Sequence, residues 1–294
     1  MSLFPWLKEF VDNLMGNSQA YLRSVRGRLY GFGAALDPAG LRFSGVLILL
    51  GYLIHENNFQ INPWHGILYL SAFFIIAVLG NMIARTTTLG MLLAFAYFLI
   101  EVLSTKKEGG YGAFWAATFP LFVILISLII WLYHISPTFK DDLRFGFEGF
   151  FSLVEKGRWE VHSNEVLKEM VVWPENLGTW VYGDGYFDSP DDLPNRFGQA
   201  YEGFYMKTDI GYLRYIFYFG AIGLIGMIST FFQITSTCIR RIKGYAPLFI
   251  FLLLVNLIGW FKVSSDIIMV FAPFLVLAYQ QNNNDVEANS SIAR

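Results

Sequence analysis

Seven long apolar runs constrain this chain more than any other feature of its sequence. Each run holds roughly 17 to 25 residues, about what an α-helix needs to cross the ~30 Å hydrocarbon core of a bilayer. The runs lie near residues 39–55, 65–83, 88–104, 113–135, 212–236, 245–261 and 264–280. Hydrophobic residues make up 55% of the chain, which is more apolar surface than a soluble fold can bury. We therefore predict an all-α integral membrane protein, a polytopic bundle of about seven transmembrane helices.

Two basic loops orient the predicted bundle. One contains Lys106 and Lys107, and the other contains Arg240, Arg241 and Lys243. Loops rich in Lys and Arg favour the cytoplasm, and the span count places both loops on that side. The predicted order is an extracytoplasmic N-terminal segment (1–38), transmembrane helices 1–4 (39–135), a large periplasmic loop (136–211), transmembrane helices 5–7 (212–280) and a cytoplasmic tail (281–294). The large loop carries 7 positive and 14 negative side chains, which agrees with an outer location.

The N-terminal segment conflicts with the positive-inside bias. Arg23, Arg26 and Arg28 would lie outside in the predicted topology, whereas basic side chains favour the cytoplasm. Either an early span is miscounted and this segment is a cytoplasmic basic N-terminus, or these arginines serve a purpose outside. A third possibility is that the chain is the later part of a longer polytopic protein.

The large loop has internal order. Ser136 and Pro137 form an N-cap and first-turn pair, and a surface helix with one apolar face is predicted to run from there to Gly157. A shorter helix is predicted from Ser163 to Pro174, and a third short element from Pro174 to the turn around Asp184. The loop should therefore contain short interfacial helices.

Asp209 and Arg214 stand where the large loop enters the fifth apolar run. An ionisable side chain at such a position is costly unless it is paired or hydrated, so both residues are functional candidates. In the alternative interpretation, Arg214 extends to the lipid headgroups and Asp209 merely caps a helix. Farther along the run, Gly220, Gly223 and Gly226 predict that another helix approaches closely.

Several segments resemble a known family. The sequence G-D-G-Y-F at 183–187, T-D-I-G-Y-L-R at 208–214 and F-Y-F-G-A-I-G at 217–223 are similar to the C-terminal half of bacterial O-antigen polymerases of the Wzy type. The R-x-R-L-Y-G-F-G segment at 26–33 resembles the outer segment that precedes a middle helix in those proteins. Members usually have ten or more spans, which leaves open that this chain is an N-terminally truncated member.

The resemblance implies an activity. Such polymerases are glycosyltransferases of the bacterial inner membrane that polymerise undecaprenyl-diphosphate-linked oligosaccharide repeat units into O-antigen or related surface polysaccharide at the periplasmic face. The expected partners are this lipid-linked oligosaccharide, membrane lipid and a chain-length regulator. No metal or other cofactor is expected, because the lipid diphosphate is itself the leaving group. The net charge of −2 offers no general field for nucleic acid.

The resemblance assigns a role to Asp209, and the chemistry of the departing diphosphate indicates the arginines that would assist it. Asp209 aligns with a proposed general base, at a position where related O-antigen ligases often carry a His-Asn pair. Arg214 is the second predicted catalytic residue, because a guanidinium suits a departing diphosphate. The predicted substrate-binding residues are Arg23, Arg26, Arg28, Asp184 and Tyr212.

Two further basic residues are predicted to lie near the site. Arg85 and Lys262 lie in short loops assigned to the outer face and would add positive charge to the site, unless they only extend toward headgroups.

Three other functions are compatible with the sequence. An O-antigen ligase differs from the polymerase only in its acceptor. A transporter or flippase of lipid-linked oligosaccharide should show internally repeated, broken spans, and an envelope scaffold would leave Asp209 and Arg214 dispensable.

Overall fold

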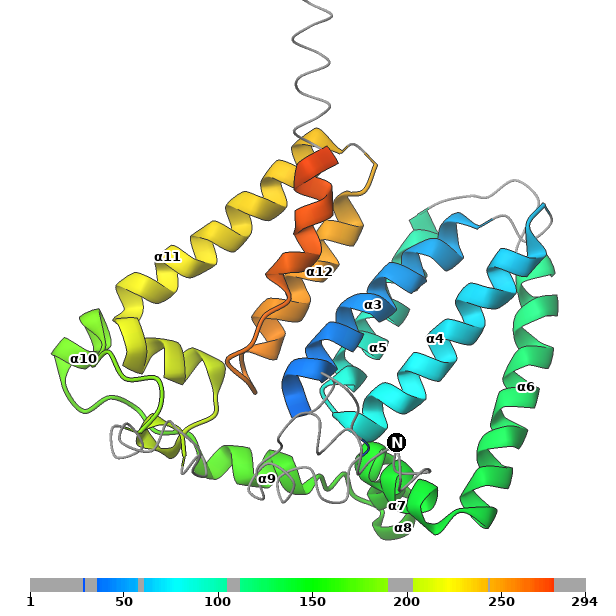
Figure 1. The fold of residues 1–294 in the computed structure, drawn as a ribbon, viewed down its shortest axis with the longest axis horizontal. Coiled ribbons are helices and arrows are strands. Elements are labelled where there is room, and N and C mark those ends of the chain that lie inside the picture. The colour runs from blue at the N-terminus through cyan, green and yellow to red at the C-terminus, as the bar shows by residue number, and fades with distance from the viewer. Residues whose placement is uncertain are drawn as a thin grey trace, which may run out of the picture.

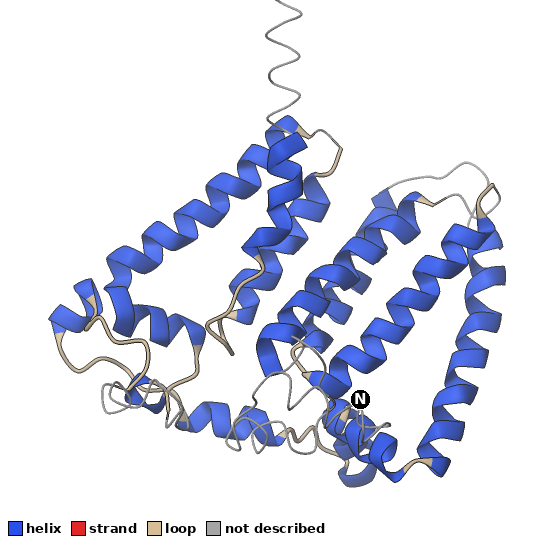
Figure 2. Cartoon of the chain, in the orientation of Figure 1, coloured by secondary structure: helices blue, strands red, loops and turns tan. Residues whose placement is uncertain are grey.

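The computed structural model describes residues 29, 36–57, 61–104, 112–189, 203–242 and 244–277 of the 294-residue chain. In these ranges the chain is built from helices and loops (Figure 2). The one strand-like feature among them is an isolated antiparallel bridge between Asp188 and Phe204. The structure therefore confirms the prediction of an all-helical fold.

Long helices run alternately up and down between two ends of the molecule (Figure 1). They are α3 (Leu36–Glu56), α4 (Pro63–Ile83), α5 (Thr87–Ser104), α6 (Gly112–Ile135), α11 (Gly211–Arg241) and α12 (Ala246–Gly259), followed by the short helix η3 (Ile268–Phe271) and a last helical segment at 272–277. Four helical stretches in the described ranges are long and apolar enough to cross a membrane, namely Leu36–Glu56, Pro63–Ile83, Thr118–Ile135 and Gly211–Arg241. The architecture is thus compatible with a helical membrane protein.

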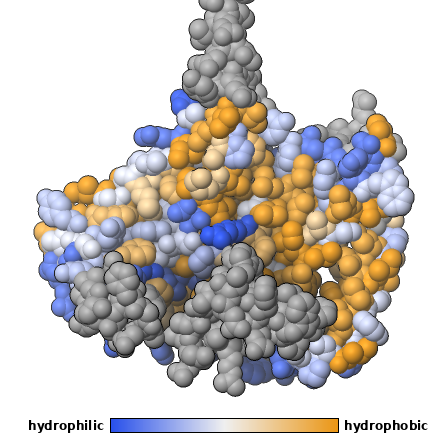
Figure 3. Space-filling view, in the orientation of Figure 1, coloured by the Kyte–Doolittle hydropathy of each residue, from blue (hydrophilic) through white to orange (hydrophobic). Residues whose placement is uncertain are grey.

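Helices α3, α5 and α12 form the main core. Leu47 and Ile48 of α3 and Leu252 and Val255 of α12 are fully buried against one another. By contrast, the apolar window of α6 has no buried residue, and hydrophobic side chains gather over the centre and right of the visible face (Figure 3). An exposed apolar helix of this kind is typical of a helix that faces lipid.

Four short helices cross one end of the bundle (Figure 1). They are α7 (Pro137–Gly146), α8 (Glu148–Lys156), α9 (His162–Glu169) and α10 (Leu177–Tyr182). Ser136 caps α7 by accepting a hydrogen bond from the Phe139 amide at 3.3 Å, as predicted. The predicted single surface helix is instead broken at Phe147, while Gly157, at φ 70°, ends its second half as expected. Helix α9 ends at Glu169, before Pro174 is reached.

Helix α11 is broken in its third turn. Phe219 and Gly220 leave helical geometry, with Gly220 at φ 66°, a conformation that favours glycine. The carbonyl groups of Phe217 and Tyr218 accept hydrogen bonds from the amides of Asp184, at 2.6 Å, and Gly185, at 3.1 Å. The loop after α10 therefore satisfies the backbone groups that the break exposes. The stretch from 221 to 241 that follows is about 31 Å long at 1.5 Å per residue.

The predicted close approach of another helix is found at only one of the three glycines. A Cβ atom on Gly220 would lie 2.2 Å from the Val181 carbonyl oxygen, so α10 does approach closely there. A Cβ atom on Gly223 would meet the Phe219 side chain of the same helix, and one on Gly226 would have no neighbour within 4 Å. The spacing of three thus marks a helix break rather than a continuous packing surface.

Candidate functional site

Polar residues from five distant segments converge at the end of the bundle that carries α7 to α10. The start of α3, the turn between α4 and α5, the turn after α12 and the start of α11 all lie at this end, and α8 joins them (Figure 1). Long-range ion pairs connect these segments, as between Lys262 and Asp37 or between Arg85 and Glu148. We call this set of charged residues, with Asp209 and Arg214, the polar cluster.

Arg214 is the most enclosed member of the polar cluster. Its side chain is 6% exposed, and its guanidinium lies 3.8 Å from the ring centre of Phe187 and 4.0 Å from that of Phe204. It donates hydrogen bonds to the Ser264 hydroxyl at 2.9 Å, the Phe187 carbonyl at 2.9 Å and the Asp188 carboxylate at 3.1 Å. Arg214 therefore joins the loop before α11 to the turn after α12, as a planar group with several donors can.

Asp209 lies beside this arginine, just ahead of α11. One of its carboxylate oxygens is 3.6 Å from an Arg214 nitrogen, and its side chain is 26% exposed. The pKa of Asp209 is raised from 3.8 to about 7, chiefly by burial; the charge of Arg214 opposes this rise, Asp37 adds to it, and Lys262 also opposes it. A carboxyl group with such a pKa exchanges protons near neutral pH, as a general acid or base requires.

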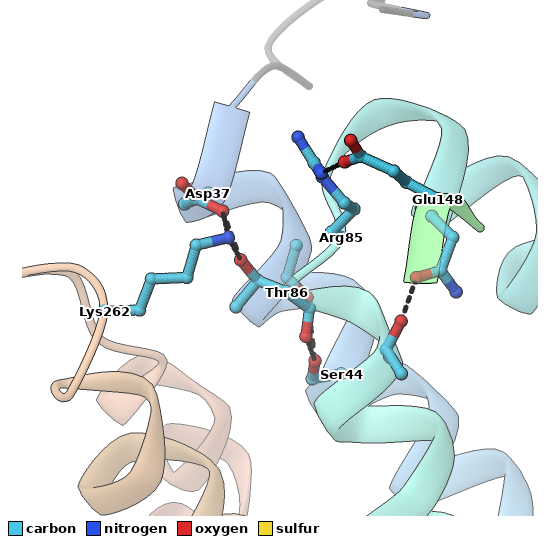
Figure 4. Close-up of polar contacts among 9 residues, drawn as sticks. Asp37, Ser44, Arg85, Thr86, Glu148 and Lys262 are labelled. Carbon is cyan, nitrogen blue, oxygen red and sulfur yellow. Dashed lines mark hydrogen bonds and ion pairs between the residues drawn. The ribbon is translucent and has the colours of Figure 1, made fainter. Parts of the chain in front are cut away.

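Lys262 and Asp37 form the second part of the polar cluster (Figure 4). The Lys262 ammonium donates to the Asp37 carboxylate at 2.8 Å and to the Thr86 hydroxyl at 3.1 Å, and Thr86 also donates to Asp37. Arg85 points the other way, to Glu148 of α8, and stacks on Phe145 at 4.3 Å. The two predicted basic residues thus lie at the same end as Asp209 and Arg214.

Local hydrogen bonds fix the turn that presents Ser264 and Lys262. The Asn256 side chain donates to the Leu252 carbonyl at 3.0 Å and accepts from the Ile267 amide at 2.8 Å. The indole nitrogen of Trp260, which is fully buried, donates to the Ser265 carbonyl at 3.0 Å. These contacts hold residues 260–267 in one conformation, because a buried amide and indole lose free energy if left unbonded.

The remaining predicted site residues have structural partners or lie outside the described ranges. Asp184 accepts hydrogen bonds from the Thr179 hydroxyl at 2.6 Å and the Tyr205 hydroxyl at 3.1 Å, which ties α10 to the segment before α11. Tyr212 donates its hydroxyl to the Leu257 carbonyl at 2.7 Å. Arg23, Arg26 and Arg28 lie outside the residues that the structure describes.

Sequence reasoning missed the residues that surround Arg214 and Lys262. Phe187, Phe204 and Ser264 contact the guanidinium, but nothing in their local sequence marks them as partners of residue 214. Asp37 carried a usable signal, because it is an acid at the start of the first apolar run. Its pairing with Lys262 could not be predicted, because the two residues are 225 positions apart.

Two hollows adjoin the polar cluster. The first, which we call the Tyr212 groove, has a volume of about 510 Å³ and runs between α9 and the first turns of α11, lined largely by apolar side chains such as Leu167, Tyr212 and Ile216. The second, which we call the Arg85–Lys262 pocket, has a volume of about 270 Å³ and lies between α8, α9 and the turns that carry its two basic residues. Asn164 of α9 lines both.

The chain matches no protein-family model, no curated protein and no solved structure.

Proposed function

We propose that this protein polymerises lipid-diphosphate-linked oligosaccharide units into a surface polysaccharide, as O-antigen polymerases of the Wzy type do. The observation that carries the proposal is Asp209, a carboxyl group of pKa about 7 held 3.6 Å from a buried arginine at one end of a helical bundle whose long helices include some apolar enough to cross a membrane. Glycosyl transfer from a lipid carrier needs such a base at the membrane surface.

The proposed reaction has one transfer step. Asp209 removes the proton from a hydroxyl group of the acceptor repeat unit, and the hydroxyl oxygen forms a bond with the anomeric carbon of the donor chain. The bond between that carbon and the diphosphate oxygen breaks, and the lipid diphosphate leaves with the electron pair. The growing polysaccharide thereby passes from one carrier to the repeat unit on another, and the proton remains on Asp209 until water removes it.

Arg214 and Lys262 receive different roles in this proposal. Arg214 is 6% exposed and enclosed by two aromatic rings, so we assign it to positioning Asp209 and to holding the loops around it. Lys262, whose side chain is 23% exposed, is the better cation for the departing diphosphate. A positive charge fixed near the site of developing negative charge lowers the barrier to its departure.

The Tyr212 groove gives the lipid part of the substrate a place to bind. Its lining is almost entirely apolar, and Ile210, Tyr212 and Leu213 on its wall follow Asp209 directly in the sequence. An isoprenoid chain lying there would hold its diphosphate near the polar cluster. The proposal includes seven transmembrane spans in the bacterial inner membrane with the polar cluster at the periplasmic face.

The test is a gel of surface polysaccharide from a bacterium whose copy of this gene has been deleted. The wild-type gene should restore a ladder of chain lengths, whereas Asp209→Asn should leave a single repeat unit with normal protein level. Asp266→Asn is the matched control, because Asp266 lies at the same end of the bundle and accepts only a local amide hydrogen bond in the described structure, which asparagine can also accept.

Each outcome separates the functions. A ligase would lose all polysaccharide from the lipid anchor rather than retain one repeat unit. An unchanged ladder in the deletion strain would exclude the polymerase. Full ladders with Asp209→Asn would remove Asp209 from the mechanism.

A further inference from the structure

The Arg85–Lys262 pocket differs in chemistry from the groove beside it. Arg85 and Lys262 contribute its two charged side chains, and none of the described residues that line it is acidic. Their counterions, Glu148 and Asp37, pair with them from outside the lining. The charged side chains among the described lining residues are therefore both cationic, and each is paired with a carboxylate that lies outside the lining.

Hydroxyl and aromatic side chains complete the pocket. Ser163, in the first turn of α9, lines it with a buried hydroxyl oxygen that has no hydrogen-bond partner among the described residues. Trp159 and Phe150 form an apolar wall, with their ring centres 5.0 Å apart. An apolar wall displaces water, which strengthens the attraction between fixed cations and an anion.

The pocket is also connected to the proposed catalytic base. Lys262, on its wall, lies close enough to Asp209 for its charge to affect that carboxyl group. Asn164 lines both the pocket and the Tyr212 groove. An anion bound in the pocket would therefore lie near the proposed base, while an apolar chain attached to it could continue into the groove.

We propose that the Arg85–Lys262 pocket binds the diphosphate headgroup of the lipid-linked substrate. The inference rests on the proposed function for the identity of the whole substrate, but the diphosphate site follows from the pocket itself. A diphosphate could bind to the two cationic side chains of this lining, which has no acidic residue among those described, and the Ser163 hydroxyl supplies a donor to its oxygens. The volume of about 270 Å³ suits a compact headgroup rather than a whole lipid.

The test measures binding of two probes to the purified full-length protein in detergent micelles. One probe is inorganic pyrophosphate, and the other is geranylgeranyl diphosphate, which adds an isoprenoid chain. Ser163→Asp places a negative charge in the pocket, and it should weaken binding of both probes at least tenfold. Ser163→Asn introduces a side chain of the same size as aspartate but without its charge, and it should change binding less than twofold.

The variants are chosen to keep the fold. An acidic residue in the first turn of a helix is favourable, so Ser163→Asp should retain α9. If thermal unfolding nevertheless shows a damaged protein, Lys262→Gln provides the second variant and should also weaken both probes. Tighter binding of geranylgeranyl diphosphate than of pyrophosphate would identify a lipid headgroup rather than free diphosphate as the ligand.

The outcomes distinguish this inference from the proposed function. Undetectable binding of both probes, or binding that neither Ser163→Asp nor Lys262→Gln weakens, would overturn the diphosphate site even if polysaccharide is polymerised. Binding that shows the expected pattern would support the site even if Asp209→Asn leaves the polysaccharide ladder unchanged.

Discussion

Replacing Asp209 by asparagine should stabilise the folded protein above neutral pH. The folded protein holds this carboxyl group at a pKa of about 7, against 3.8 without the surrounding structure. Between these values the folded protein binds more protons at this position than the unfolded chain does, so the free energy of unfolding falls as pH rises. The free energy of unfolding stops falling well above pH 7, where the carboxylate is charged in both the folded and the unfolded protein.

The magnitude follows from the size of the shift. At 1.36 kcal/mol per pKa unit, the destabilisation grows from about 2 kcal/mol at pH 5 to about 4 kcal/mol at pH 8. Water that reaches the 26% exposed side chain makes these values upper limits. Asparagine remains neutral at both pH values, so its advantage over aspartate should be larger at pH 8 by about 2 kcal/mol, a difference in Tm on the order of 5 °C.

Thermal unfolding in detergent micelles, followed by intrinsic fluorescence at pH 5 and pH 8, measures this difference. Glu175→Gln is the matched control, because it removes one negative charge from an exposed position and should shift Tm equally little at both pH values. A Tm gain for Asp209→Asn that is the same at pH 5 and pH 8, or a loss at pH 8, would refute the reasoning. Such a result would mean that attraction to Arg214 and Lys262 outweighs the cost of burial.

Two further predictions concern the base and the helix break. The polymerisation rate of the wild-type protein should rise with pH through about 7 and then level off, because only the charged form of Asp209 accepts a proton; a flat rate from pH 5.5 to 8.5 would contradict this role. Gly220→Ala should destabilise the protein by about 2 kcal/mol or more, since its positive φ and its contact with Val181 exclude a side chain, whereas Gly226→Ala should be neutral or slightly stabilising. Thermal unfolding of both variants checks the comparison, and similar Tm values would contradict it.

The long helices were predictable because hydrophobicity averaged over about 20 residues tolerates local exceptions. The run at 65–83, for example, became α4 at Pro63–Ile83. The last run, predicted at 264–280, starts later as η3 at Ile268. Here Asp266 accepts the Ile268 amide and Asn256 accepts the Ile267 amide, so side-chain hydrogen bonds rather than hydropathy set the start.

The candidate site was predictable only in part. Asp209 and Arg214 could be singled out because charges near an apolar span need a reason to be there. Their surroundings could not, since Arg214 meets Phe187 and Ser264 through contacts 27 and 50 positions apart. The close approach of another helix was predicted correctly at Gly220 but wrongly at Gly223 and Gly226, and the helix break was not foreseen, because glycine permits both close helix contacts and positive φ.

The break in α11 determines how strongly a membrane voltage can act on the charges of the site. Moving one elementary charge across the whole bilayer changes its energy by about 2.3 kcal/mol per 100 mV. In the proposed membrane topology, the stretch of about 31 Å after the break spans the hydrocarbon core, and the eight residues before the break, among them Arg214, lie with Asp209 at the boundary. Charges at the boundary cross little of the potential drop. The protonation of Asp209 should therefore follow the pH of its own compartment and be nearly insensitive to the electrical state of the membrane.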